Sequence, residues 1–272
     1  MLTERAGSYI LGHSEREMER LQRQGEIFAE ATEDVFCRAG IRPGMRVLDV
    51  GCGVGDVSLL VGRMVGPTGL VHGIDRTGSA VDMARHRAEA AGLSHLRFEV
   101  SDIGRLPERA DYDAVVGRFI LLHLGDPAET VKRLAAQLRP GGVLASVEMD
   151  IESATAVPEL PLFRQAVRWI IELYRRTGVE PDMGSRLWAT YRAAGLEPRM
   201  TGTCRVEGGA GAVVYDYLAE SLRTLAPAMI TLGIASADEI GLDSFVDRLR
   251  ADAITGGHCF LLPRIVGAWV RV

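Results

Sequence analysis

The strongest constraint on the fold is a repeated alternation of short apolar segments with helical segments between residues 46 and 150. The apolar segments predict strands at Arg46–Val50, Leu70–Asp75, Leu96–Ser101, Tyr112–Val116 and Val143–Met149. Helix stop and start signals separate them, such as Gly66-Pro67 after the first helix and Asp126-Pro127 before the last. Strands and helices that alternate in this way form a mostly parallel sheet with helices on both faces. The sequence therefore predicts an α/β fold.

Further helices and strands are predicted on either side of this alternation. Ser14 and Glu17 have capping-box spacing and predict a helix that ends at Gly40. After Asp150, helices are predicted near 160–177 and 185–194, followed by a strand at 199–206. Two more helical stretches follow, and the second begins at the capping-box pair Ser236 and Glu239. The chain then has an apolar run at 260–270. No linker interrupts them, so we predict one domain. Its parts are an N-terminal helical lid (1–41), a ligand-binding core (42–152), a helical lid insertion (153–195) and a segment that completes the sheet (196–272).

Composition narrows the class of protein. The chain has 272 residues, of which 47% are hydrophobic and 25% charged, as is usual for a globular protein with a sizeable core. Its net charge of -5 argues against a nucleic-acid partner, because such proteins generally present a basic face. The four cysteines show no spacing typical of zinc ligands, so we expect reduced thiols and no metal. No signal peptide or membrane-spanning run is evident, which predicts a soluble, cytoplasmic protein with no membrane partner.

A glycine-rich turn follows the first predicted strand. Gly51, Gly53 and Gly55 permit positive φ angles and let a ligand approach the backbone closely. In an open parallel sheet, ligands bind at the carboxyl ends of the strands. A dinucleotide fingerprint is excluded, because its sixth position is Asp56 in one frame and Ser58 in the other. A P-loop is excluded because no Gly-Lys-Ser/Thr follows.

The segment Asp49-Val50-Gly51-Cys52-Gly53-Val54-Gly55 resembles motif I of class I methyltransferases, which use S-adenosylmethionine. Further matches follow in the order of that family, at Asp75, at Ser101-Asp102-Ile103 and at Leu138-Arg139-Pro140-Gly141-Gly142. The resemblance covers roughly residues 46–150. It implies a Rossmann-like fold with a seven-stranded sheet and helical lid additions, and it implies S-adenosylmethionine as the cofactor, with S-adenosylhomocysteine as product. The layout is similar to UbiE-like and natural-product methyltransferases that act on small molecules.

The resemblance also implies roles for single residues. Asp49, Gly51, Cys52, Gly53 and Gly55 belong to the loop that binds the cofactor. Because a buried carboxylate without a partner is costly, the methionine ammonium is a suitable partner for Asp49, directly or through water.

Two acidic positions follow in the motif order. At Asp75, with Arg76 beside it, an acidic side chain accepts the ribose hydroxyls, although it also suits a helix cap. Ser101, Asp102 and Ile103 contact the adenine, and an aspartate there is equally typical of a turn.

The segment Gly117–Leu124, after the fourth strand, supplies the candidate catalytic residue. It resembles the corresponding segment of small-molecule methyltransferases, in which an aromatic residue or histidine lies near the methyl group. His123 has a suitable pKa for a general base, and the alternative is a structural histidine at a helix start. Arg118 and Phe119 are candidate cofactor contacts; for Arg118, an ion pair within the protein is equally compatible with the sequence.

No metal cluster is expected at this edge of the sheet. Asp111 and Asp113 lie at the start of the fourth strand, on the opposite side from the site. Glu148 and Asp150, at the end of the fifth strand, could reach the active face, but two carboxylates alone do not specify a metal.

The acceptor is predicted to meet side chains from the additions to the core. Tyr9, His13 and Gln24 are candidate lid contacts, with Tyr9 and Gln24 reaching the cofactor. The aromatic residues after Asp150 belong either to the core or to a pocket: Trp169, Tyr174, Trp188, Tyr191, Tyr215 and Tyr217. Together they suggest a lid over a mid-sized organic molecule.

The predicted reaction is in-line methyl transfer from S-adenosylmethionine to an O, N or C atom of a small organic metabolite, as in secondary metabolism. Three alternatives stay open: a non-methylating reaction such as cyclisation, methylation of tRNA or protein, and a binding module without catalysis. The apolar run at 260–270 either pairs with a second copy in a homodimer or completes the sheet.

Overall fold

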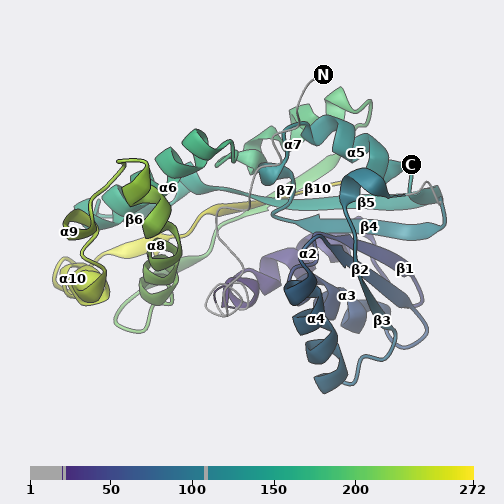
Figure 1. The fold of residues 1–272 in the computed structure, drawn as a ribbon, viewed down its shortest axis with the longest axis horizontal. Helices are drawn as coiled ribbons and strands as arrows, with labels where there is room; N and C mark the ends of the chain where they lie inside the picture. Colours follow the sequence, from purple (N-terminus) through teal and green to yellow (C-terminus); the bar gives the residue numbers. More distant parts are fainter. Residues whose placement is uncertain (1–19, 21–22, 107–109) are drawn as a thin grey trace. The chain divides into compact units, whose positions relative to one another are not determined.

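The structure is a computed structural model that describes residues 20, 23–106 and 110–272 (Figure 1). The chain forms two compact units. The first, which we call the sheet unit, comprises the described residues 23–106, 110–150, 182–203 and 265–272. The second, the helical unit, contains residues 20, 151–181 and 204–264. The prediction of a single domain with helical additions stays a prediction.

A seven-stranded sheet forms the centre of the sheet unit, in the order β3-β2-β1-β4-β5-β10-β7. Its strands are β1 (Arg46–Val50), β2 (Leu70–Asp75), β3 (Leu96–Val100), β4 (Tyr112–Arg118), β5 (Leu138–Asp150), β7 (Arg199–Thr203) and β10 (Arg264–Arg271). The first four neighbouring pairs are parallel, and β10 pairs with β7 antiparallel. The predicted seven-stranded, mostly parallel sheet is confirmed. Strand order reverses at β1, which is where such sheets bind ligands.

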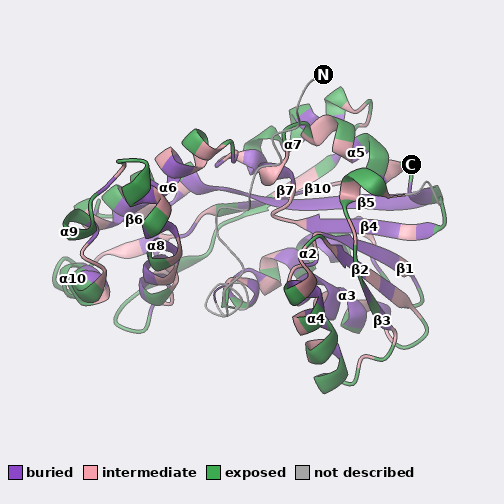
Figure 2. Ribbon diagram, viewed as in Figure 1, coloured by how far each residue is buried: buried purple, intermediate pink, exposed green. Residues whose placement is uncertain are grey.

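Helices cover the sheet on both sides. They are α2 (Ala29–Ala39), α3 (Asp56–Val65), α4 (Gly78–Ala90), α5 (Pro127–Ala135) and α7 (Met183–Ala193), with short 3-10 helices η1 (Ile103–Arg105) and η2 (Leu121–His123). In Figure 1, α2, α3 and α4 lie on one side of the sheet, and α5 and α7 on the other. Strands covered on both faces read as continuous apolar runs, and Figure 2 shows β4 and β5 buried along most of their length.

The predicted helix ends follow from local chemistry. The side chain of Asp126 accepts a hydrogen bond from the Glu129 backbone N–H (2.9 Å), and Pro127 occupies the first turn of α5. Helix α3 ends at Val65, directly before Gly66. The Ser236 and Glu239 capping box is present in both directions, as predicted.

The helical unit contains its own small sheet. Its elements are η3 (Ile151–Ser153), β6 (Thr155–Val157), α6 (Pro161–Thr177), β8 (Val206–Gly208), α8 (Val214–Thr231), α9 (Ala237–Ile240), α10 (Leu242–Thr255) and β9 (Cys259–Leu261). Strand β9 pairs antiparallel with both β6 and β8. The ring of Phe260 in β9 packs against the rings of Phe163 and Tyr215, with distances between ring centroids of 5.1 Å and 5.5 Å. These contacts pack the small sheet against α6 and α8. Within the described residues, no helix has the length and apolarity needed to cross a membrane.

Two strand predictions were wrong in their extent. The segment 199–206 is divided, because β7 ends at Thr203 and β8 begins at Val206 in the other sheet. The run 260–270 is likewise divided between β9 and β10. Pro263 has no N–H to donate to a ladder, and the strand pairing changes there. Strand β10 lies inside the seven-stranded sheet, so this part of the run completes the sheet. The predicted helix start at Ser14 and Glu17 falls outside the described residues.

Packing of α2 on the sheet depends on a glycine in β10. A Cβ added to Gly267 would lie 2.3 Å from Val35 Cγ2. We expect Gly267→Ala to lower the free energy of unfolding by about 1–3 kcal/mol, because overpacking forces neighbouring atoms apart. Chemical denaturation measures this effect. Val35→Ala in the Gly267→Ala background should recover part of the loss, and no recovery would contradict the predicted clash.

Candidate functional site at the glycine-rich loop

The loop between β1 and α3 contains three glycines with positive φ: Gly51 (65°), Gly53 (52°) and Gly55 (90°). Gly51 is also required by packing, because an added Cβ would lie 1.9 Å from Ile120 Cδ1. An added Cβ on Gly53 would meet nothing within 4 Å. Gly53 therefore serves the backbone turn, and the space beside it is open to a ligand.

Asp75, at the end of β2, holds this loop in place. Its Oδ2 accepts a hydrogen bond from the Gly53 N–H (3.0 Å), and its Oδ1 accepts one from the Thr77 N–H (2.8 Å). Cys52 is buried, and its N–H donates to the carbonyl of Ile74 (2.9 Å). The glycine loop is thus fixed to β2 through both backbone and side chain. The ribose-binding role of Asp75 stays a prediction.

Asp49 is a buried carboxyl group at the end of β1, with only 1% of its surface exposed. Its Oδ2 accepts a hydrogen bond from Ser58 Oγ (2.5 Å). Its Oδ1 has no hydrogen-bond partner among the described residues. Burial raises the pKa of Asp49 to about 7, against the lowering effects of Ser58 and Arg118. A positively charged or hydrogen-donating ligand at Oδ1 would offset this cost.

Asp56, at the start of α3, is a half-buried acidic group near the same loop. Arg87 lies 2.8 Å and Arg118 4.0 Å from its carboxylate oxygens. Burial raises its pKa, and the two arginines oppose the shift. A Cβ added to Gly25 would lie 2.6 Å from Asp56 Cγ, so the backbone preceding α2 packs directly on this carboxylate. In the sequence, Asp56 served only to exclude a dinucleotide site, and it was not predicted to be a site residue. An acidic residue at the first position of a helix was the available signal.

The end of β3 lies beside Asp75, since the Ser101 N–H donates to the Asp75 carbonyl (2.9 Å). Asp102 is exposed, and its Oδ1 accepts a hydrogen bond from the Gly104 N–H (2.7 Å), which caps η1. Ile103 begins that helix and is half-buried, and Arg76 is exposed. The turn role of Asp102 is therefore present, and its contact with adenine stays a prediction.

Arg118 and Phe119 follow β4. Arg118 donates to Thr32 Oγ1 (3.3 Å), and its guanidinium lies 5.5 Å from the centre of the Phe119 ring. Phe119 has a φ of 57°, an unusual conformation for a residue with a bulky side chain. Its ring also meets the edge of Phe28 at 5.7 Å. These contacts hold the start of the segment after β4 against α2, and a cofactor contact for either residue stays a prediction.

His123 is the last residue of η2, and it is half-buried. Its N–H donates to the Ile120 carbonyl (3.1 Å). The structure thus places His123 in the segment that begins beside the glycine loop, since Ile120 packs against Gly51. Its role as a base stays a prediction.

Glu148, near the end of β5, is a buried group that the sequence analysis did not include in the site. Its Oε1 accepts hydrogen bonds from the N–H groups of Ile120 (2.9 Å) and Leu121 (2.7 Å). Its Oε2 lacks a partner in the part of the chain that the structure describes. Burial raises its pKa to about 8. A carboxylate within an apolar strand was the available signal, but its partners are distant in sequence.

Of the three predicted lid contacts, the structure describes only Gln24. Gln24 is half-buried next to α2, whereas Tyr9 and His13 lie outside the described residues. Of the aromatic residues after Asp150, Tyr191 and Tyr215 are fully buried and belong to the cores of their own units. Trp188 is 47% exposed.

The acidic residues at the amino end of β4 have structural partners. Asp113 accepts a hydrogen bond from the Arg46 N–H (2.7 Å) and pairs with Arg139, and Asp111 pairs with Arg46 (3.2 Å). They lie at the amino end, as predicted. Across residues 20, 23–106 and 110–272, no cluster of at least three His, Cys, Asp or Glu side chains is arranged to hold a metal.

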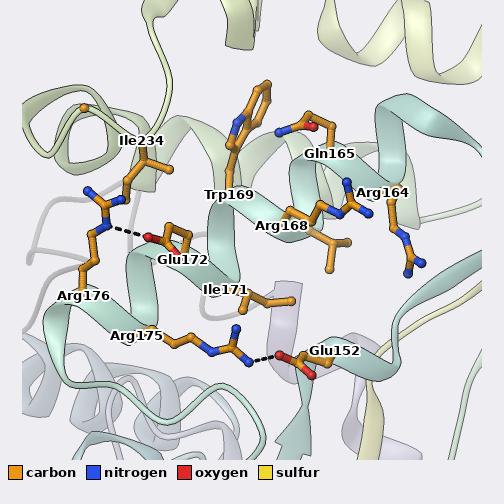
Figure 3. Close-up of a pocket in the computed structure, with 12 residues that line it drawn as sticks. Glu152, Arg164, Gln165, Arg168, Trp169, Ile171, Glu172, Arg175, Arg176 and Ile234 are labelled. Carbon is orange, nitrogen blue, oxygen red and sulfur yellow. Dashed lines mark hydrogen bonds and ion pairs between the residues drawn. The ribbon is translucent and has the colours of Figure 1, made fainter.

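The helical unit contains an open groove of about 560 Å³ along α6 (Figure 3). Half of the residues that line it are charged. Arg175 pairs with Glu152 of η3, and Arg176 pairs with Glu172 (2.7 Å). Arg168 also lines this groove. Most of its charges are therefore already engaged in exposed ion pairs, which is typical of a solvated helix face.

Comparison with known proteins connects this geometry to a family. Residues 41–173 match a family model described as a methyltransferase domain. The curated demethylmenaquinone methyltransferase of Staphylococcus aureus is 32% identical over 127 residues, which are 46% of this chain and 49% of that protein. The chain spans about half or less of the curated relatives that it matches, 49% in this case and 40% in another.

Solved structures share the fold at low sequence identity. The YcgJ protein from Bacillus subtilis aligns with a TM-score of 0.59 and 20% identity, over 90% of this chain and 99% of that one. The [4+2]-cyclase SpnF aligns with a TM-score of 0.52 and 22% identity, over 89% of this chain and 79% of that one. At these identities the likeness establishes the fold alone. The predicted Rossmann-like class I fold is confirmed.

The buried carboxyl of Asp49 makes stability depend on pH. Its pKa is raised in the folded state, so folding favours its protonated form, and stability falls as pH rises from about 4 to about 7. Asp49→Asn removes this dependence. We expect the variant to gain on the order of a few kcal/mol relative to the unmodified protein between pH 5 and pH 8. Urea unfolding at several pH values measures the difference. Glu148 contributes a further decline up to about pH 8 in both proteins, and parallel curves would contradict the role of Asp49.

Proposed function

We propose that this protein, whose residues 41–173 are a methyltransferase domain in the class I fold, transfers a methyl group from S-adenosylmethionine to a small organic metabolite. The methylated atom is an O, N or C atom of that acceptor. The main support is the Oδ1 atom of Asp49, a buried acceptor beside the glycine loop with no partner among the described residues. S-adenosylmethionine carries a primary ammonium and a sulfonium, and either charge favours an ionised carboxylate nearby.

The residues present fit this cofactor. Asp49 would bind the methionine end of the cofactor, and Gly53 leaves its backbone open to the ligand. Asp75 already orients the loop through the Gly53 N–H, and its carboxylate oxygens retain lone pairs for ribose hydroxyls. Asp102 and Ile103, which follow the neighbouring strand β3, would contact the adenine. Bound S-adenosylmethionine supplies an activated methyl group, and the protein contributes alignment of donor and acceptor.

His123 is the residue that we assign to the acceptor. An imidazole near neutral pH removes a proton from an acceptor hydroxyl, amine or acidic carbon as the new bond to the methyl group forms. Ile120, three residues earlier, packs against Gly51, so the segment that carries His123 starts next to the glycine loop. This continuity supports a role for His123 at the site formed around the glycine loop.

A small organic acceptor is favoured by two observations. The relative from Staphylococcus aureus is named for an organic acceptor, demethylmenaquinone. The net charge of -5 gives no general attraction for a polyanion such as tRNA. A second candidate function is chemistry without methyl transfer, since the SpnF neighbour with this fold is a cyclase. Fold alone does not select between them.

Donor binding should depend on Asp75. Asp75→Ala removes both the acceptor for the Gly53 N–H and the proposed ribose ligand, so we expect at least about tenfold weaker binding of S-adenosylhomocysteine. Isothermal titration calorimetry measures this affinity. Asp82→Ala is the matched control, because Asp82 is an exposed aspartate of α4 whose partner is Arg85 (2.7 Å). Equal affinity in the two variants would exclude the proposed role.

A screen of small metabolites with methyl-labelled S-adenosylmethionine tests the reaction itself. We expect labelled product and an equal amount of S-adenosylhomocysteine. Turnover of another kind without S-adenosylhomocysteine would favour the cyclase alternative. With the acceptor known, His123→Ala should lower kcat by about 10²–10⁴-fold with little change in donor affinity. His86→Ala, which changes an exposed histidine of α4, is the control. Unchanged turnover of the His123 variant would remove that residue as the base.

A further inference from the structure

Three polar side chains alternate along β5 and point to the same face of the strand. Ser146, Glu148 and Asp150 are all buried, with exposed fractions of 4%, 1% and 2%. Ser146 bonds to the hydroxyl of Tyr191 (2.8 Å), and Asp150 accepts from the N–H (2.6 Å) and hydroxyl (2.7 Å) of Ser185. Both of these partners lie on α7. Glu148 differs, because its partners lie on the segment after β4.

The donors to Glu148 are the N–H groups that open the 3-10 helix η2. The first N–H groups of any helix lack an acceptor within the helix, and a local side chain usually caps them. The residue at this cap position, Ile120, provides no side-chain hydrogen bond. Glu148 instead accepts from Ile120 (2.9 Å) and Leu121 (2.7 Å), 28 and 27 residues away in sequence. It therefore acts as a long-range cap.

The segment that Glu148 holds would not keep its shape by local preference. Phe119 has a φ of 57°, which is costly for a residue other than glycine. The next residue, Ile120, places its Cδ1 where a Cβ of Gly51 would otherwise lie. The hydrogen bonds from Glu148 act directly on this residue and the one after it. They set how closely the segment approaches the glycine loop and where η2, with His123 at its end, begins.

We infer that Glu148 is a positioning residue of the proposed methyltransferase. Its carboxyl group fixes the backbone of residues 119–123 against the glycine loop, so that His123 meets the acceptor in one orientation. The effect of Glu148 on turnover rests on the proposed function. Its effect on the backbone of residues 119–123 can be measured whether or not the protein transfers a methyl group. A catalytic contact is not assigned to Glu148, since both of its hydrogen bonds go to the backbone.

The variants are chosen to separate capping from general stability. Glu148→Gln keeps a carbonyl oxygen at the same distance and should still accept both N–H groups. Glu148→Asp withdraws the carboxyl group by one methylene, and Glu148→Ala removes it. Ser146→Ala is the matched control, because Ser146 lies on the same face of the same strand, is equally buried and bonds to Tyr191 rather than to the loop.

Amide hydrogen exchange of the full chain, without any ligand, tests the positioning itself. We expect exchange in residues 119–123 to rise by about tenfold or more in Glu148→Ala and Glu148→Asp, and to stay near the original rate in Glu148→Gln and Ser146→Ala. If the alanine variant fails to fold, the comparison of aspartate with glutamine carries the test. Unchanged exchange in Glu148→Asp, or an equal rise in Ser146→Ala, would overturn the inference.

Kinetics then connect the backbone to turnover. With an acceptor from the screen, Glu148→Asp should lower kcat by about tenfold or more while the affinity for S-adenosylhomocysteine changes less, and Glu148→Gln should restore kcat. A loss confined to KM would contradict the positioning of His123. If exchange behaves as expected but the unmodified protein transfers no methyl group, the proposed function fails and the capping role of Glu148 stands.

Discussion

Burial of carboxyl groups at the carboxyl ends of parallel strands is the constraint on which this site depends. Asp49 and Glu148 lie near the ends of β1 and β5, and burial raises the pKa of each, to about 7 and about 8. In each group one oxygen is hydrogen-bonded within the protein and the other has no partner among the described residues. A buried carboxyl oxygen without a partner is costly, so both positions are candidates for a role beyond stability.

The same type of interaction holds both halves of the site: a carboxyl group accepts hydrogen bonds from the backbone of a neighbouring loop. Asp75 fixes the glycine loop through the Gly53 N–H, and Glu148 fixes the segment after β4 through Ile120 and Leu121. Side-chain packing joins the halves, since Ile120 occupies the space left free by the absent side chain of Gly51. The glycine loop and the segment after β4 are therefore joined by direct side-chain packing as well as held by carboxyl groups.

Features of the fold and site that depend on residues close in sequence were predictable, and those that depend on residues distant in sequence were not. Strands β1 and β2, the cap at Asp126 and the end of α3 are set by local patterns, and the sequence predicts them to within a residue. The two backbone groups that Glu148 caps are 28 and 27 residues away. The partners of Asp56 are also distant, since Arg87 lies on α4 and Arg118 on β4. The division of 199–206 between two sheets is decided by strand pairing, which residue types alone do not encode.

The same difference in range explains why the donor is easier to infer than the acceptor. The donor loop needs glycine at defined positions, and glycine is conspicuous because no other residue tolerates φ angles of 52–90° there without strain. The proposed acceptor side rests on one side chain, His123, whose segment is held by hydrogen bonds to a residue distant in sequence. From the sequence, His123 is only a histidine next to leucines. The hydrogen bonds from its segment to Glu148 are what draw attention to its position. Acceptor chemistry in such folds should therefore be sought in the long-range caps that orient the loops, rather than in the reactive residues alone.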